Sequence, residues 1–202
     1  MARPTEFDRD EAIASAIKVF ARQGFEAAST SDLLEAMGIA RQSLYGAFGD
    51  KRSLFLEALR RYAAGSLAQM REALAEGTAA EGIEAALLVG LGSSDDVESG
   101  CLGVGSVVEF SRSDPEINAL NDAAGETVAA AFSARVRDGV EAGELDAGLD
   151  TDAVGRMLLV LRSGLKVAAR GGAGEAELRD TARLALRGLT STRSGSECRS
   201  PP

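Results

Sequence analysis

The chain has 202 residues and is 45% hydrophobic and 4% aromatic, a composition that favours helices over a sheet and suffices for one large domain or two small ones. It has no histidine, which excludes Ser-His-Asp and Cys-His catalytic arrangements and removes the commonest metal ligand. The net charge of −9 lies entirely beyond residue 62, because residues 1–62 hold nine basic and nine acidic side chains whereas the rest hold 13 and 22.

Several other classes of protein are disfavoured by what the sequence lacks. There is no Walker A motif and no G-x-S-x-G motif, so we expect no enzyme, no cofactor and no metal site. The longest apolar run, residues 85–91, is far too short to span a membrane. The N-terminus has no apolar segment, so we expect no signal peptide. Two cysteines, Cys101 and Cys198, suit a reducing cytoplasm, where we expect the protein.

The first two predicted helices are defined by their ends. The first begins after Asp8, a capping residue, and carries an apolar stripe that ends at Gly24. The second begins at Ser29, whose S-x-x-D spacing to Asp32 is a capping arrangement. Gly38 can supply the positive φ that ends this helix. We therefore expect two helices, a turn at Gly38 and then the start of a third helix.

The third predicted helix presents polar side chains outward. Leu44 and Phe48 are spaced i, i+4 and face inward, whereas Arg41, Gln42, Ser43 and Tyr45 point away from them. This is the pattern of a helix-turn-helix whose second helix lies in a DNA major groove. Arginine can bind guanine, and glutamine can bind adenine, through paired hydrogen bonds to the base edge. The alternative is a plain surface helix.

The remaining two thirds of the chain are also predicted to be helical. Asp50 caps a long helix over residues 51–76, which links the first module to the next. Residues 92–100 form a polar loop, and residues 190–202, rich in Ser, Arg and Pro, are expected to be disordered. Further helices are expected over residues 79–91, 101–112, 115–141, 152–169 and 175–189. The fold class is therefore all-α, with about nine helices.

The region around the third helix resembles a known family signature. It is similar to the DNA-binding signature of the TetR family of bacterial repressors, over residues 8–60. Residues 99–116 resemble, more weakly, one branch of TetR-type effector domains. Two positions depart from the family pattern: Ala40 replaces a capping Ser or Thr, at a cost of about 1 kcal/mol, and Gly46 replaces a common ring. The signature residues are Phe20, Gly24-Phe25, the run 38–45, Phe48, Asp50-Lys51 and Leu54-Phe55.

The resemblance implies a transcriptional regulator, a ligand-responsive repressor that binds a palindromic operator as a homodimer. It implies an N-terminal three-helix DNA-binding domain over residues 1–50 and a helical effector-binding and dimerisation domain over residues 51–189. The last two helices, about 152–189, would form the dimer interface, or their apolar faces would close the monomer core. Tyr45 and Lys51 would chiefly contact phosphates. The expected DNA-binding residues are Ser29, Thr30, Arg41, Gln42, Ser43, Tyr45 and Lys51.

The middle helices would surround a pocket for an unidentified small molecule. The candidate effector-binding residues are Tyr62, Met70, Cys101, Glu109, Phe110 and Arg162, and each can instead be an ordinary core or surface residue. Cys101 lies near a predicted helix N-terminus, where a thiolate is favoured. It would therefore either sense oxidants or electrophiles or fill a small apolar space. The alternative function is an all-helical scaffold or adaptor without DNA binding, which would explain the acidic charge but not the polar cluster around Arg41.

Overall fold

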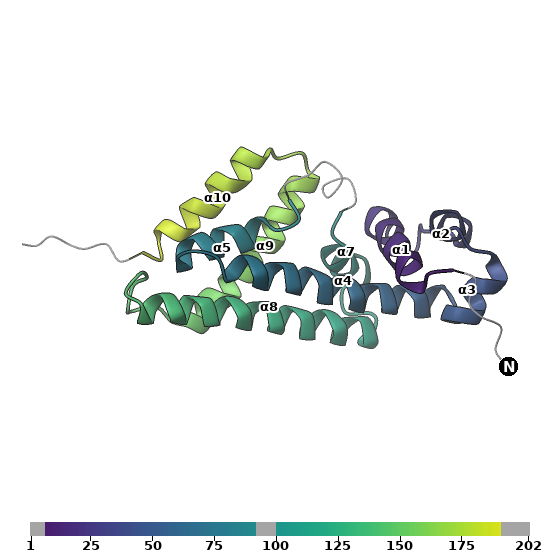
Figure 1. Ribbon diagram of the computed structural model, residues 1–202, viewed down its shortest axis with the longest axis horizontal. Helices are drawn as coiled ribbons and strands as arrows, with labels where there is room; N and C mark the ends of the chain where they lie inside the picture. Colours follow the sequence, from purple (N-terminus) through teal and green to yellow (C-terminus); the bar gives the residue numbers. More distant parts are fainter. Residues whose placement is uncertain (1–6, 92–99, 191–202) are drawn as a thin grey trace, which may run out of the picture.

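The computed structural model describes residues 7–91 and 100–190, and these ranges contain nine α-helices and no strand (Figure 1). The all-α fold class is confirmed. Residues 92–99 of the predicted loop (92–100) and residues 191–202 of the predicted disordered tail (190–202) lie outside the described residues. The helices are α1 (Arg9–Gln23), α2 (Thr30–Met37), α3 (Arg41–Phe48), α4 (Lys51–Leu74), α5 (Ala79–Leu88), α7 (Leu102–Phe110), α8 (Pro115–Glu141), α9 (Thr151–Arg170) and α10 (Glu175–Arg187).

Side-chain caps fix where most of the helices begin. The carboxylates of Asp8, Asp50, Asp114 and Asp150 each accept hydrogen bonds from backbone N–H groups in the first turns of α1, α4, α8 and α9. These bonds satisfy donors that have no partner within the helix, so they define the starts that the sequence predicts. The observed helix ends differ more from the predicted ones than the helix starts do. The helix expected to reach residue 91 ends at Leu88, and Gly90 has a positive φ of 75° in the turn that follows.

Two hydrophobic clusters hold the helices together, and α4 contributes to both. The first cluster contains α1, α2, α3 and the N-terminal half of α4, and it is completed by Leu102 and Ile117 from later in the chain. The second joins α5, α8, α9 and α10 to Met70 and Leu74 of α4. Figure 1 shows α1–α3 gathered at one end, with α4 running from them beside α8 into the rest of the molecule. The division of the chain at Lys51 stays a prediction.

The closest helix packing is between α8 and α9, and it depends on a glycine. A Cβ atom at Gly155 would lie 2.1 Å from the Ser133 hydroxyl oxygen and 2.6 Å from the carbonyl oxygen of Ala129. No side chain fits there, so the α9 backbone rests directly on α8. This contact fixes α9 as one wall of the space between α4, α7 and α8.

Candidate DNA-binding face and effector cavity

Local features set both ends of α2 and the start of α3. The Ser29 hydroxyl accepts from the Asp32 N–H, and the Asp32 carboxylate accepts from the Ser29 N–H, each at 3.1 Å. These bonds from Ser29 hold the pKa of Asp32 below its usual value. Gly38 ends α2 with a φ of 65°, and α3 begins at Arg41. Ala40 occupies the N-cap of α3 without a side-chain hydrogen bond, so the predicted loss of a cap is confirmed.

One face of α3 is buried and the other is exposed, as the sequence predicts. Leu44 and Phe48 are buried in the first hydrophobic cluster. Arg41 and Gln42 are exposed, and the Tyr45 side chain is 47% exposed. Neither Arg41 nor Gln42 is held by a hydrogen bond or ion pair within the described part of the chain. Their donors and acceptors are therefore available to base edges or phosphates.

The residues at the start of α2 and α4 lie beside this face. The Lys51 ammonium lies 4.6 Å from the centre of the Phe25 ring and donates to the Glu26 carbonyl oxygen at 3.3 Å. This position keeps the charge at the N-terminus of α4, where backbone N–H groups also favour an anion. Thr30 is the first residue of α2 and is half-buried. The predicted phosphate contacts of both residues stay predictions.

Most other arginines of α1 and of the first half of α4 are paired with acids. Arg52 forms ion pairs with Asp114 and Glu116, and Arg60 pairs with Glu116. Arg9 and Arg61 likewise pair with Glu57 and Asp10. Since Arg41 forms no ion pair with another described residue, its charge is not cancelled locally. The acidic net charge of the chain therefore does not prevent an attraction between α3 and phosphate.

Two side chains from the larger domain hold the turn between α1 and α2. The Glu109 carboxylate, at the end of α7, accepts hydrogen bonds from the N–H groups of Phe25 and Glu26, both at 2.7 Å. The Arg170 guanidinium, at the end of α9, donates to the Arg22 carbonyl oxygen at 3.0 Å. The position of the DNA-binding module thus depends directly on the positions of α7 and α9.

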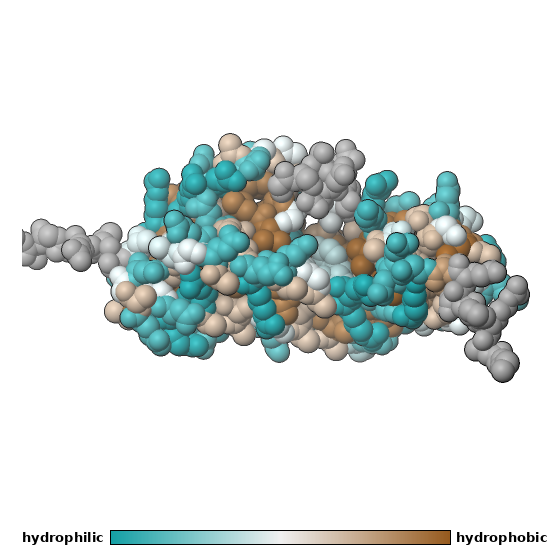
Figure 2. Space-filling view, viewed as in Figure 1, coloured by the Kyte–Doolittle hydropathy of each residue, from teal (hydrophilic) through white to brown (hydrophobic). Residues whose placement is uncertain are grey.

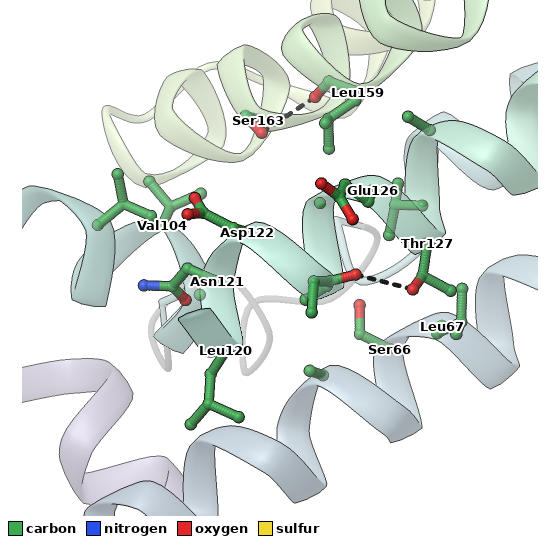
Figure 3. A pocket seen from close by; sticks show the side chains of 18 of the residues that line it. Ser66, Leu67, Val104, Leu120, Asn121, Asp122, Glu126, Thr127, Leu159 and Ser163 are labelled. Atoms are coloured by element: carbon green, nitrogen blue, oxygen red, sulfur yellow. Dashed lines mark hydrogen bonds between the residues drawn. The ribbon is translucent and has the colours of Figure 1, made fainter. Parts of the chain in front are cut away.

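A cavity of about 930 Å³ lies between α4, α7, α8 and α9. This volume is typical of a site for a small organic molecule. Figure 3 shows Leu67 of α4 and Leu159 of α9 on opposite walls, with Leu120 of α8 nearby. On α8, the side chains of Asp122 and Glu126 also border the cavity (Figure 3). Its walls are therefore mainly apolar, with acidic groups on the α8 side.

Cys101 lines the cavity as the N-cap of α7. Its Sγ atom accepts hydrogen bonds from the Tyr62 hydroxyl at 3.1 Å, the Val104 N–H at 3.4 Å and the Lys166 ammonium at 3.5 Å. Burial raises the pKa of the thiol, but the Lys166 charge and these hydrogen bonds outweigh it and hold the pKa below its usual value of 9.0. Cys101 therefore loses its proton more readily than an unperturbed cysteine does.

Arg162 is a buried cation in the same wall. Its side chain is only 7% exposed, and it donates to the Ala86 carbonyl oxygen at 3.3 Å and to the Ser66 hydroxyl at 3.1 Å. Burial lowers the pKa of Arg162 and also that of Lys166, four residues further along α9. Within residues 7–91 and 100–190, neither cation forms an ion pair with a carboxylate. A buried cation, Arg162, and a half-buried one, Lys166, therefore share one side of the cavity.

Comparisons with known proteins identify the family. Residues 12–58 match the model of the bacterial regulatory proteins of the tetR family. The transcriptional regulator YezE of Bacillus subtilis (strain 168) is 37% identical over 155 residues, which are 75% of this chain and 79% of YezE. The chain belongs to the TetR family. The solved structure of a cysteine mutant of the TetR-family regulator CifR, complexed with 26-bp double-strand operator DNA, is 34% identical, with a TM-score of 0.76 over 92% of this chain and 98% of CifR.

Membership of the TetR family makes this chain a DNA-binding transcriptional regulator and not an enzyme. The transcriptional repressor ComR of Escherichia coli (strain K12) is similar only over the DNA-binding part, with 47% identity over 60 residues, or 30% of this chain and 29% of ComR. None of the described helices combines the length and hydropathy that a membrane span requires. The described residues also contain no cluster of three or more acidic, cysteine or histidine side chains that could hold a metal ion.

Within this TetR-family structure, the cavity brings together half of the predicted effector-binding residues. Met70 is instead fully buried in the second hydrophobic cluster. Glu109 binds the turn after α1, and the Phe110 ring packs 5.6 Å from the rings of both Phe25 and Phe55. These three residues are absent from the cavity lining formed by the described residues. The candidates that line it are Tyr62, Cys101 and Arg162.

Lys166 is the functional candidate that the sequence reasoning missed. It contacts both Tyr62 and Cys101, which come from α4 and α7. A signal was present, because Lys166 follows Arg162 by four residues and therefore lies on the same helix face, next to the buried Leu165. Two cations beside an apolar stripe are unusual for a helix that packs into a core.

Proposed function

We propose that this TetR-family regulator is a ligand-responsive repressor that binds a palindromic operator as a homodimer in the bacterial cytoplasm. The observation that supports it most is the exposed face of α3, where Arg41, Gln42 and Tyr45 stand free of ion pairs beside the N-terminus of α4. CifR, which is similar over nearly the whole chain, has been solved with operator DNA. A scaffold without DNA binding would have no use for this face.

The DNA contacts divide into two kinds. Arg41 and Gln42, in the first turn of α3, would read base edges, and Ser43 would contact a base or a phosphate. Tyr45 and Lys51 would bind phosphates, which position the module without reading sequence. Ser29 and Thr30 would offer the N-terminus of α2 to a further phosphate.

The dimer would form through α9 and α10. Four large apolar side chains on these helices are exposed: Met157 (42%), Val160 (70%), Val167 (57%) and Leu184 (68%). Figure 2 shows brown, apolar surface between hydrophilic side chains over the region of these helices. Other apolar residues of the same helices, such as Leu158 and Leu178, are buried in the chain's own core. The exposed residues therefore support a dimer interface, and the buried residues support a role of the same helices in closing the monomer core.

Ligand binding would be transmitted through α7 and α9. Cys101 in the cavity wall and Glu109 at the α1–α2 turn lie at opposite ends of α7. On α9, Lys166 in the cavity is one helical turn from Arg170, which also holds that turn. A ligand that shifts either helix would move the DNA-binding module. Release requires only that the ligand prefer the shifted state by a few kcal/mol.

Selection from random DNA tests the proposed operator binding. Purified protein should enrich a palindrome whose half-sites are about one helical turn apart or a multiple of that. In fluorescence-anisotropy titrations with the enriched duplex, Gln42→Ala should relax the preference at one base position of each half-site. Glu72→Gln, an exposed change on α4, serves as the control. Absence of any sequence preference at moderate salt would support the adaptor alternative and refute the proposal.

Light scattering tests the proposed interface. Val160→Glu places a charge on the exposed face of α9 and should convert the dimer to a monomer with weaker operator binding. Ala134→Glu, at an exposed position of α8, is the matched control and should stay dimeric. A dimer unaffected by Val160→Glu and by Leu184→Glu would show that the subunits meet elsewhere.

A further inference from the structure

The cavity wall formed by α9 carries more positive charge than its surroundings can balance. Arg162 and Lys166 face the same space, one helical turn apart, and, after burial itself, the Arg162 charge helps to lower the pKa of Lys166. Arg162 is 7% exposed, and the two groups that accept its hydrogen bonds, the Ala86 carbonyl and the Ser66 hydroxyl, are neutral. Burying a cation without a countercharge is costly.

The groups nearby leave at least one charge unbalanced. Ala86 lies in the last turn of α5, so its carbonyl adds the partial negative charge of a helix C-terminus, which falls short of a full charge. A Cys101 thiolate would neutralise one cation, and it lies nearer to Lys166 through their 3.5 Å contact. Cys101 and Tyr62 also attract Arg162, but Arg162 would share that thiolate with Lys166 and has no carboxylate partner within residues 7–91 and 100–190. This residual charge faces a cavity large enough for an organic molecule.

The α8 side of the cavity restricts where a second charge on the ligand can lie. Asp122 and Glu126 border the cavity from α8 (Figure 3), and Asp122 is already paired with Arg112 at 2.9 Å. A second anionic group that reached α8 would be repelled there. The rest of the lining is mainly apolar, with Leu67 of α4 and Leu159 of α9 on opposite sides. The cavity thus has a basic end, an apolar middle and an acidic side.

We propose that the effector of this regulator is an amphiphilic organic monoanion whose acid group lies between Arg162 and Lys166 and whose apolar body extends along Leu67 and Leu159. The inference rests on the proposed function, because it names the ligand class of the same effector cavity. A neutral molecule of the same shape would leave these two cations unpaired, and a dianion would place its second charge against Glu126.

Two fluorescent probes that share one aromatic framework test the anion requirement. 1-Anilinonaphthalene-8-sulfonate carries a single negative charge, and N-phenyl-1-naphthylamine is its neutral counterpart. Arg162→Met and Lys166→Met should each weaken sulfonate binding about tenfold or more, the equivalent of 1.4 kcal/mol, while changing the affinity of the neutral probe less than about twofold. Arg71→Met, which removes an exposed cation of α4 outside the cavity lining, should leave both affinities unchanged.

Competition and operator binding complete the test. Decanoate should displace the sulfonate probe and release operator DNA, whereas decanedioate should do so at least about tenfold less well. Sulfonate binding that is insensitive to both substitutions, or equal losses of both probes, would overturn the proposal. Operator binding without ligand is measured on the same samples. Its absence would refute the proposed function, whereas intact operator binding with no preference for the anion would refute this inference alone.

Discussion

Glu109 is the side chain that most directly connects the larger domain to the DNA-binding module. Its carboxylate accepts hydrogen bonds from two backbone N–H groups, those of Phe25 and Glu26, each at 2.7 Å. A hydrogen bond to a charged group contributes about 1.5–3 kcal/mol, and the exposure of Glu109 places each bond at the lower end. Glu109→Gln preserves the shape but turns an N–H₂ donor toward one of the two N–H groups. We therefore expect the loss of one bond, about 1.5 kcal/mol.

Amide hydrogen exchange measures this loss at the affected atoms. A local loss of about 1.5 kcal/mol should speed exchange at Phe25 or Glu26 about tenfold. The Asp32 amide, bonded to Ser29 within the same module, is the internal control and should not change. Glu72→Gln, an exposed change on α4, is the control variant. Unchanged rates at both target amides would refute the proposed connection. Equal acceleration at Asp32 would refute it as well, because it would show general unfolding of the module.

Three other changes give separate readouts. Lys51→Ala should weaken binding to all DNA sequences alike and flatten the salt dependence by about one unit per subunit, whereas an unchanged slope would remove its phosphate contact. Ala40→Ser should restore the missing cap of α3 and raise the free energy of unfolding by about 1 kcal/mol in denaturant titrations. Alkylation of Cys101 by iodoacetamide requires the thiolate, so its rate should rise with pH to a midpoint below 9.0. Lys166→Met should move that midpoint upward, and a midpoint that stays fixed would contradict the effect of the lysine charge.

The fold was predictable because its helix starts are encoded locally. Asp8, Ser29, Asp50, Asp114 and Asp150 each cap a helix within a few residues of themselves, and the buried face of α3 follows from i, i+4 spacing. The helix ends were less predictable, because they depend on which glycine takes a positive φ and on packing beyond the last turn.

The cavity was only partly predictable, because its chemistry comes from distant segments. Tyr62, Cys101 and Lys166 meet across separations of 39 and 65 residues, and no periodicity in the sequence brings those three helices together. The same limit applies to α9, where Leu158 is buried in the chain's own core but Val160 is exposed. In the sequence, Leu158 and Val160 both belong to the same apolar stripe. Only the packing of α9 on α8 determines that one is buried and the other exposed.

The hydrophobic cluster under the DNA-binding module has a consequence for synthesis of the chain. Leu102 and Ile117, which complete this cluster, lie far downstream of α1–α3. At 5–20 residues per second, the ribosome would need roughly 3–12 s to add these later residues after finishing Leu59. During that time Leu59, Phe55 and their neighbours would lack part of their cover. A fragment that ends at Leu59 would keep this cluster incomplete, so we expect it to be less stable than a fragment that extends through Ile117.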